Sequence, residues 1–101
     1  MHWLRSIKNF YHLIILEILA FLISIIKFLN NCQSEKGGFG GGPYQQPHLA
    51  PTYAAINALC TLNCDRALSI IKRKELLQWI KSLKHTNGSF RMHEGGEEDV
   101  R

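Results

Sequence analysis

Two cysteines, Cys60 and Cys64, stand four residues apart, the spacing at which two thiols share one face of a helix. Thiolates bind zinc, but a zinc site needs three or four protein ligands, and no second pair stands at a matching spacing. We therefore expect no metal site in this chain. Cys32 makes the cysteine count odd without a disulfide framework, so reduced thiols in a cytosolic protein are the simplest interpretation.

A second candidate for chemistry is the glycine-rich segment of residues 37–43, Gly-Gly-Phe-Gly-Gly-Gly-Pro. Glycine loops can hold phosphates, but this one lacks the Lys-Ser/Thr ending of a P-loop, and no predicted strand precedes it. Nucleotide binding is therefore disfavoured. The segment is better explained as a tight turn between helices.

Charge is distributed unevenly along the 101 residues, which carry a formal net charge of +4. Residues 65–84 are basic, with six Lys or Arg against two acidic residues, whereas residues 85–101 are acidic. No aromatic residues interleave with the basic ones at recognition spacing, so we expect no nucleic-acid partner. A solvated helix face followed by an acidic loop accounts for the pattern.

The elements that would position any site begin with an apolar run at residues 12–29, interrupted by Glu17 and Lys27. It is long enough to cross a membrane, but a carboxylate at the centre of a span costs about 2.5–3.5 kcal/mol. A helix that is apolar on every side also suits the interior of a larger fold. A core helix and a membrane anchor through residues 12–29 both remain open.

The chain repeats itself at a spacing of 51 residues. Gly37-Gly38-Phe39 aligns with Gly88-Ser89-Phe90, and Phe28-Leu29 aligns with Trp79-Ile80. A period near 50 residues is typical of arrays whose units cannot bury their own apolar faces. We predict repeat units at about residues 25–50 and 76–101, joined by helices within residues 51–75. Residues 1–24 would form a divergent apolar helix.

Each unit should be helical. Leu76, Leu77, Ile80 and Leu83 fall on one face of a helix that ends at Asn87-Gly88. Pro51 suits a first helical turn, and residues 52–62 should continue that helix. Its alanines, Ala54, Ala55 and Ala58, would permit close approach to a neighbour. The prediction is an all-α fold of helical hairpins joined by glycine-rich turns.

Two segments carry a family resemblance. Residues 32–43 lead into Pro-His-Leu-Ala-Pro-Thr-Tyr-Ala-Ala at 47–55, and Phe-Arg-Met-His at 90–93 is followed by Gly-Gly-Glu at 95–97 and Asp-Val-Arg at 99–101. Over residues 25–101 the chain resembles the farnesyltransferase β subunits of the prenyltransferase α/α-toroid family. The resemblance implies a partial α/α toroid, with about two of six helical hairpins.

The resemblance also implies the chemistry of the parent enzyme, which is the zinc-dependent transfer of a farnesyl group from farnesyl diphosphate to the cysteine of a C-terminal CaaX motif. An α subunit would be the partner, and the location would be cytoplasmic. In the family, the zinc ligands and the diphosphate-binding residues match positions beyond residue 101. We therefore expect no zinc and no transferase turnover for this chain by itself, and we assign no catalytic residue.

Three residues match family positions on the peptide side of the site: His48, Ala50 and Arg101. His48 and Ala50 would lie beside the carboxy-terminal end of the CaaX peptide, and Arg101 would contact its backbone with a guanidinium that offers several fixed donors. Tyr53, one turn beyond Ala50, would line the same wall or be plain core. His48 could instead simply cap the helix that begins near Pro51.

Two alternatives to an enzyme segment remain. The chain could be a non-catalytic interaction module that binds the α subunit, or a small membrane-anchored protein.

Overall fold

The computed structural model of the chain describes residues 2–84, 89–94, 98 and 99. Four helices come first: α1 (His2–Cys32), α2 (Leu49–Leu62), α3 (Asp65–Ser69) and α4 (Arg73–Ser82). Two short strands, β1 (Phe90–Arg91) and β2 (Glu98–Asp99), then pair antiparallel. The predicted all-α class is confirmed. The two-residue strand pairing is an addition that the sequence pattern did not predict.

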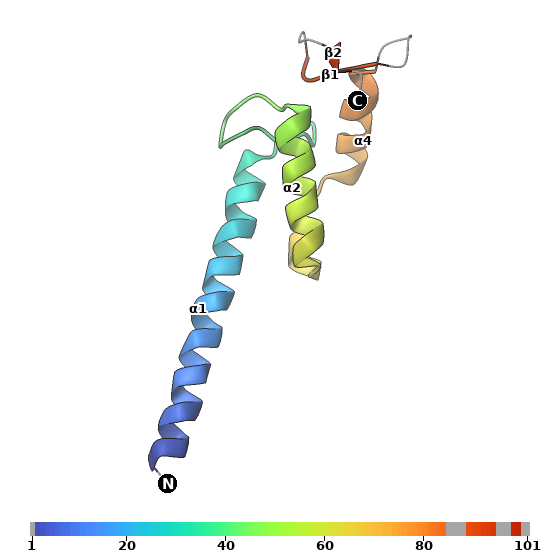
Figure 1. Ribbon diagram of the computed structural model, residues 1–101. Coiled ribbons are helices and arrows are strands. Elements are labelled where there is room, and N and C mark those ends of the chain that lie inside the picture. Colours follow the sequence, from blue (N-terminus) through green and yellow to red (C-terminus); the bar gives the residue numbers. More distant parts are fainter. Residues whose placement is uncertain (1, 85–88, 95–97, 100–101) are drawn as a thin grey trace.

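Helix α1 is a continuous helix of 31 residues and forms the long arm of a molecule that measures 71 × 23 × 21 Å (Figure 1). Neither proline nor glycine interrupts residues 2–32, so nothing in the sequence stops the helix earlier. Only Ile26 and Cys32 of α1 are buried, because only its last turns approach the rest of the chain. The predicted boundary near residue 24 lies inside this helix, so the division into an amino-terminal helix and a repeat unit remains a prediction.

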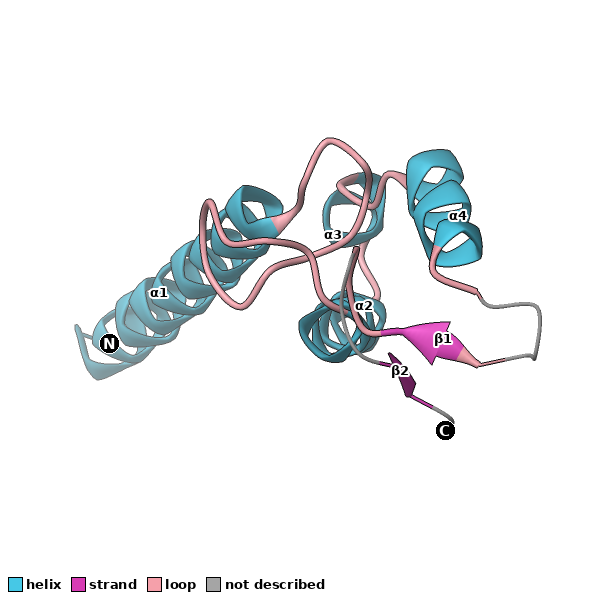
Figure 2. Cartoon of the chain, turned by 90° about the horizontal axis from the view of Figure 1, so that it is seen from above, coloured by secondary structure: helices cyan, strands magenta, loops and turns pink. Residues whose placement is uncertain are grey.

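Helix α2 is the central element; it lies between α1 and α4 in Figure 1, and Figure 2 shows α3 next to it. Pro51 lies in its first turn, as predicted from its fixed φ and missing N–H. The helix ends at Leu62; the N–H of the next residue, Asn63, still donates to the Leu59 carbonyl, and its left-handed backbone (φ 46°) turns the chain out of the helix. Of its four alanines, only Ala55 is buried, so close helix approach is limited to that position.

The main core forms where α1 ends and the glycine-rich loop crosses α2 and α3. Phe39 and Leu59 are fully buried there. The cluster consists of Ile26, Cys32, Phe39, Ala55, Leu59 and Ala67, with Leu29, Ile56, Leu62, Ile70 and Ile71 packed around it. One side chain of the predicted loop, Phe39, therefore lies at the centre of the core and ties the loop to the helices.

Helix α4 and the residue after it bury most of the face that the sequence predicted, with Leu76 and Ile80 half-buried, but Trp79 takes the place expected for Leu77. Trp79 (4% exposed) and Leu83 (2%) are buried, whereas Leu77 is 53% exposed. Leu77 was wrongly included in the inward face; the side of α4 that meets the loop at Gly38 carries Trp79 instead. The predicted end of this helix at Asn87-Gly88 lies outside the described residues.

The glycine-rich loop lies directly on α4. Gly37 has φ of +93°, and a Cβ atom built there would collide with the backbone of Leu76. A Cβ on Gly38 would meet the Trp79 ring at 2.9 Å. These two glycines therefore permit close contact between loop and helix, in agreement with the predicted role of the segment as a tight turn.

Candidate functional site

The first candidate site residue, His48, caps the start of α2. Its backbone is extended (φ −143°, ψ 144°), and its Nδ1 atom accepts a hydrogen bond from the Ala50 N–H at 3.1 Å. The capping role considered from the sequence is thus confirmed. Because Nδ1 is an acceptor in this contact, the neutral ring carries its proton on Nε2, which becomes a donor.

A second histidine, His93, lies against His48. Their ring centroids are 5.4 Å apart and the rings are tilted by 40°. The chain that carries His93 is held in place by the Leu49 N–H, which donates to the Met92 carbonyl at 2.7 Å. Sequence reasoning did not assign His93 to the peptide side of the site, although the Phe-Arg-Met-His string at residues 90–93 was part of the resemblance.

These two rings border a surface hollow of about 480 Å³, which we call the histidine hollow. It is lined by Gly41, Gln45, Gln46, Pro47, His48, Ala50, Pro51 and His93. None of these residues is acidic, and the imidazole and amide groups offer hydrogen-bond donors. The histidine hollow is therefore suited to a ligand that presents acceptor oxygens.

The structure brings together two of the four residues expected on the peptide side, His48 and Ala50. Tyr53 lies on α2 one turn beyond Ala50 and is 75% exposed, so it is a surface residue and not core. It does not line the histidine hollow. Arg101 lies outside the described residues.

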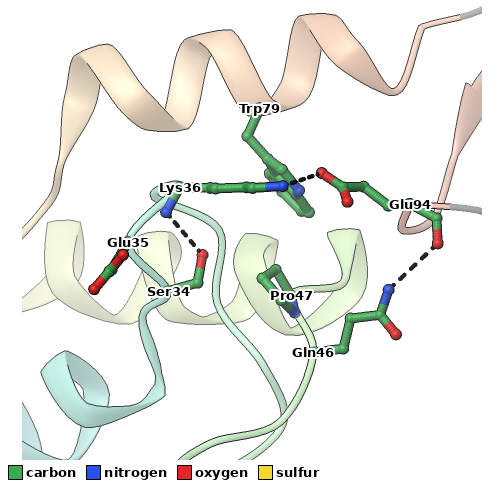
Figure 3. A pocket seen from close by; sticks show the side chains of 7 residues that line it. All are labelled: Ser34, Glu35, Lys36, Gln46, Pro47, Trp79 and Glu94. Atoms are coloured by element: carbon green, nitrogen blue, oxygen red, sulfur yellow. Dashed lines mark hydrogen bonds and ion pairs between the residues drawn. The ribbon is translucent and has the colours of Figure 1, made fainter.

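A second hollow, of about 310 Å³, lies beside the first and shares Gln46 and Pro47 with it (Figure 3). Here the Lys36 ammonium pairs with the Glu94 carboxylate at 2.7 Å, and Gln46 Nε2 donates to the Glu94 carbonyl at 3.3 Å. Trp79 reaches into this region from α4. These contacts connect the residues on either side of the glycine-rich segment to the segment that follows β1.

Metal-ligand geometry is not found in the part of the chain that the structure describes, where no three His, Cys, Asp or Glu residues form a group that could hold an ion. Cys60 and Cys64 are exposed free thiols. Cys32 is buried in the core, and this burial raises the pKa of its thiol above 9.0. The described residues thus do not fit the zinc site that the family resemblance implies for the parent enzyme.

Comparison with known proteins identifies the family. The family model of the prenyltransferase alpha-alpha toroid domain matches residues 10–101. The chain is 57% identical over 76 residues to "Protein farnesyltransferase subunit beta" of Arabidopsis thaliana, which covers 75% of this chain and 16% of the relative. It is 51% identical over 76 residues to the protein of the same name from Pisum sativum (75% and 18%), and 46% identical over 78 residues to that of Pyricularia oryzae (77% and 15%).

The chain therefore spans about a sixth of the length of these curated relatives. The matched share, three-quarters of the chain, agrees with the extent of the resemblance seen in the sequence, and the family match confirms the partial α/α toroid. On these grounds the chain belongs to the prenyltransferase α/α-toroid family, as a segment similar to farnesyltransferase β subunits.

Proposed function

We propose that the chain serves as part of a protein farnesyltransferase β subunit and forms the wall that receives the carboxy-terminal end of a CaaX protein. The observation that carries this proposal is the histidine hollow, which joins His48 and Ala50 at the start of α2 and has no acidic side chain among its described lining residues. A peptide carboxylate needs such donors and would be repelled by carboxylates.

The contribution of these residues to the reaction is orientation. A substrate held at its carboxy terminus presents its cysteine at a fixed distance, and such positioning can supply several kcal/mol of the barrier reduction. Zinc in the parent enzyme would supply the thiolate form of that cysteine. We propose that zinc and diphosphate binding come from other parts of the subunit, with an α subunit as partner, and that the complex is cytoplasmic.

The test is a hybrid β subunit, in which the 76 matched residues of this chain replace the corresponding segment of the Arabidopsis thaliana relative. The hybrid would be co-expressed with the α subunit of the same organism and assayed for farnesyl transfer to a CaaX peptide. We expect zinc-dependent transfer by the hybrid and none by the isolated chain. A hybrid that co-purifies with the α subunit but transfers no farnesyl group would contradict the proposal.

A second candidate function is that of a small membrane-anchored protein without catalysis. Helix α1 favours it, because this helix is long and apolar enough to cross a membrane and only 6% of its apolar stretch is buried. The same exposure is expected of a toroid helix whose neighbours belong to other parts of a subunit. The other alternative is a non-catalytic module that binds the α subunit by itself. Failure of the isolated chain to bind the α subunit at micromolar concentration would exclude it.

A further inference from the structure

We infer that His93 is a second substrate-binding residue, which acts with His48 on the terminal carboxylate of the peptide. The inference rests on the proposed function and extends it to a residue that the family resemblance did not assign. Four observations carry it: the anchoring of the residue-92–94 segment, the position of the two rings, their hydrogen-bonding state and the charge around them.

The segment that carries His93 is held on both sides. On one side Met92 accepts the hydrogen bond from Leu49 at the start of α2. On the other side Glu94 is bound twice, through its carbonyl to Gln46 and through its carboxylate to Lys36. These contacts fix the backbone of His93 beside the histidine hollow whether or not its ring takes part, so the ring is available for another role.

Both imidazoles use only Nδ1 in contacts with described residues. In His48 this atom accepts from Ala50, so Nε2–H is a donor. In His93, Nδ1 lies 3.4 Å from Gln46 Nε2 and 3.1 Å from the Glu94 carbonyl oxygen. The Glu94 carbonyl oxygen can only accept, so a neutral ring that donates to it from Nδ1 leaves Nε2 as an acceptor. A neutral ring that accepts from Gln46 at Nδ1 carries its proton on Nε2, and a cationic ring also has a proton there.

A carboxylate in the histidine hollow would select the states with a proton on Nε2, in which His93 supplies a second N–H donor beside that of His48. A carboxylate has two oxygens and can accept one hydrogen bond on each from two neighbouring donors. The Glu94 carboxylate, on the residue next to His93, is engaged by Lys36 (Figure 3), and Glu94 does not line the histidine hollow. The charge of the described lining residues therefore favours an anionic group in this hollow over a cationic one.

The experiment uses the hybrid subunit in complex with the α subunit and two CaaX peptides, one with a free terminal carboxylate and one with a terminal amide. His93→Ala should raise KM for the carboxylate peptide about ten-fold, the loss of one hydrogen bond to a charged group, with kcat changed less than about two-fold. For the amide peptide, KM should rise much less, because its carbonyl oxygen accepts only the weaker hydrogen bond of a neutral group. His93→Gln, which retains an N–H donor, should recover much of the loss, and the exposed α2 variant Asn57→Ala is the matched control.

Two results would overturn the inference while leaving the proposed function intact. One is an unchanged KM in His93→Ala for the carboxylate peptide. The other is an equal loss for both peptides, which would make His93 a structural residue. If the hybrid with His93 present transfers no farnesyl group to either peptide while bound to the α subunit, the proposed function fails and the inference fails with it.

Discussion

The Thr52 hydroxyl accepts a hydrogen bond from the Phe39 N–H at 2.9 Å and donates to the Phe39 carbonyl oxygen at 3.3 Å. Both residues are buried; Thr52 belongs to α2 and Phe39 to the glycine-rich loop. The same Phe39 carbonyl accepts the His48 N–H at 3.1 Å. The Thr52 side chain thus provides hydrogen-bond partners for both backbone groups of Phe39, at the point where the loop enters the core and next to the histidine hollow.

Thr52→Val removes this pairing while keeping the shape of the side chain. The Phe39 N–H would then lie buried without its partner, which costs about 1–3 kcal/mol of unfolding free energy. Thr52→Ser, which retains the hydroxyl, should cost less. The measurement is urea unfolding of the detergent-solubilised chain followed by circular dichroism, and equal stability of Thr52→Val and the unaltered chain would contradict the role assigned to this pair.

The helices of this fold were largely predictable from the sequence. The run at residues 12–29, Pro51 and the apolar spacing after residue 76 each indicated a helix, because periodicity and turn chemistry are local properties. The burial of Trp79 in place of Leu77 on α4 was not predictable, because Trp79 is buried through contact with a loop about 40 residues earlier. The short strands also depend on pairing between segments that have no local strand pattern.

The candidate site was predictable only in part, and for the same reason. His48 and Ala50 came from the family resemblance, and the structure places both at one hollow. His93 lies 45 residues beyond His48, so its proximity follows from the hydrogen bonds of Leu49 and Gln46 to the residue-92–94 segment, not from its spacing. Tyr53 was correctly predicted to lie in a helix, but the exposure of its side chain depends on how α2 packs against its neighbours.

Substitutions of His48 separate capping from peptide binding. Asparagine is a good N-cap residue, so His48→Asn should keep the stability of the chain, whereas His48→Ala should lose about 1 kcal/mol. Neither variant retains the imidazole Nε2–H, so both should raise KM for the CaaX peptide in the hybrid complex. The two measurements are the unfolding midpoint and the KM; recovery of KM by His48→Asn would show that the ring matters only as a cap.

The two ends of the glycine-rich loop should differ in tolerance to alanine. Gly37→Ala introduces a Cβ that collides with the Leu76 backbone at a φ of +93°, so it should destabilise the chain by more than about 1 kcal/mol. Gly41→Ala meets only the flexible Gln45 side chain, at 3.0 Å, and should have little effect. Thermal unfolding of the two variants under identical conditions compares them directly, and similar melting temperatures would argue against the close contact between loop and α4.

The Cys32 thiol should make stability depend on pH in the alkaline range. Burial raises its pKa in the folded state above 9.0, so the folded chain holds this proton more tightly than the unfolded chain does. The contribution is complete below pH 9.0 and is lost as the pH rises through the folded pKa. Urea unfolding from pH 8 to 10.5 should therefore show a steeper decline for the unaltered chain than for Cys32→Ala. Identical slopes would contradict the burial of this thiol.

Helix α1 exposes a large apolar surface. Trp3, Phe10 and Phe21 are each more than 60% exposed, so the isolated chain should self-associate unless detergent, membrane or protein covers this helix. If α1 packs within a larger subunit, as the proposed function requires, alkaline carbonate should release the chain from cell membranes.

The control is a variant of Glu17, the acidic residue within α1. Glu17→Leu removes a cost of about 2.5–3.5 kcal/mol for inserting this helix into a membrane. The Glu17→Leu variant should therefore be retained in the membrane pellet more than the unaltered chain, which makes it the positive control. Retention of the unaltered chain after carbonate treatment would favour a membrane anchor, because partner packing gives no reason for resistance to extraction.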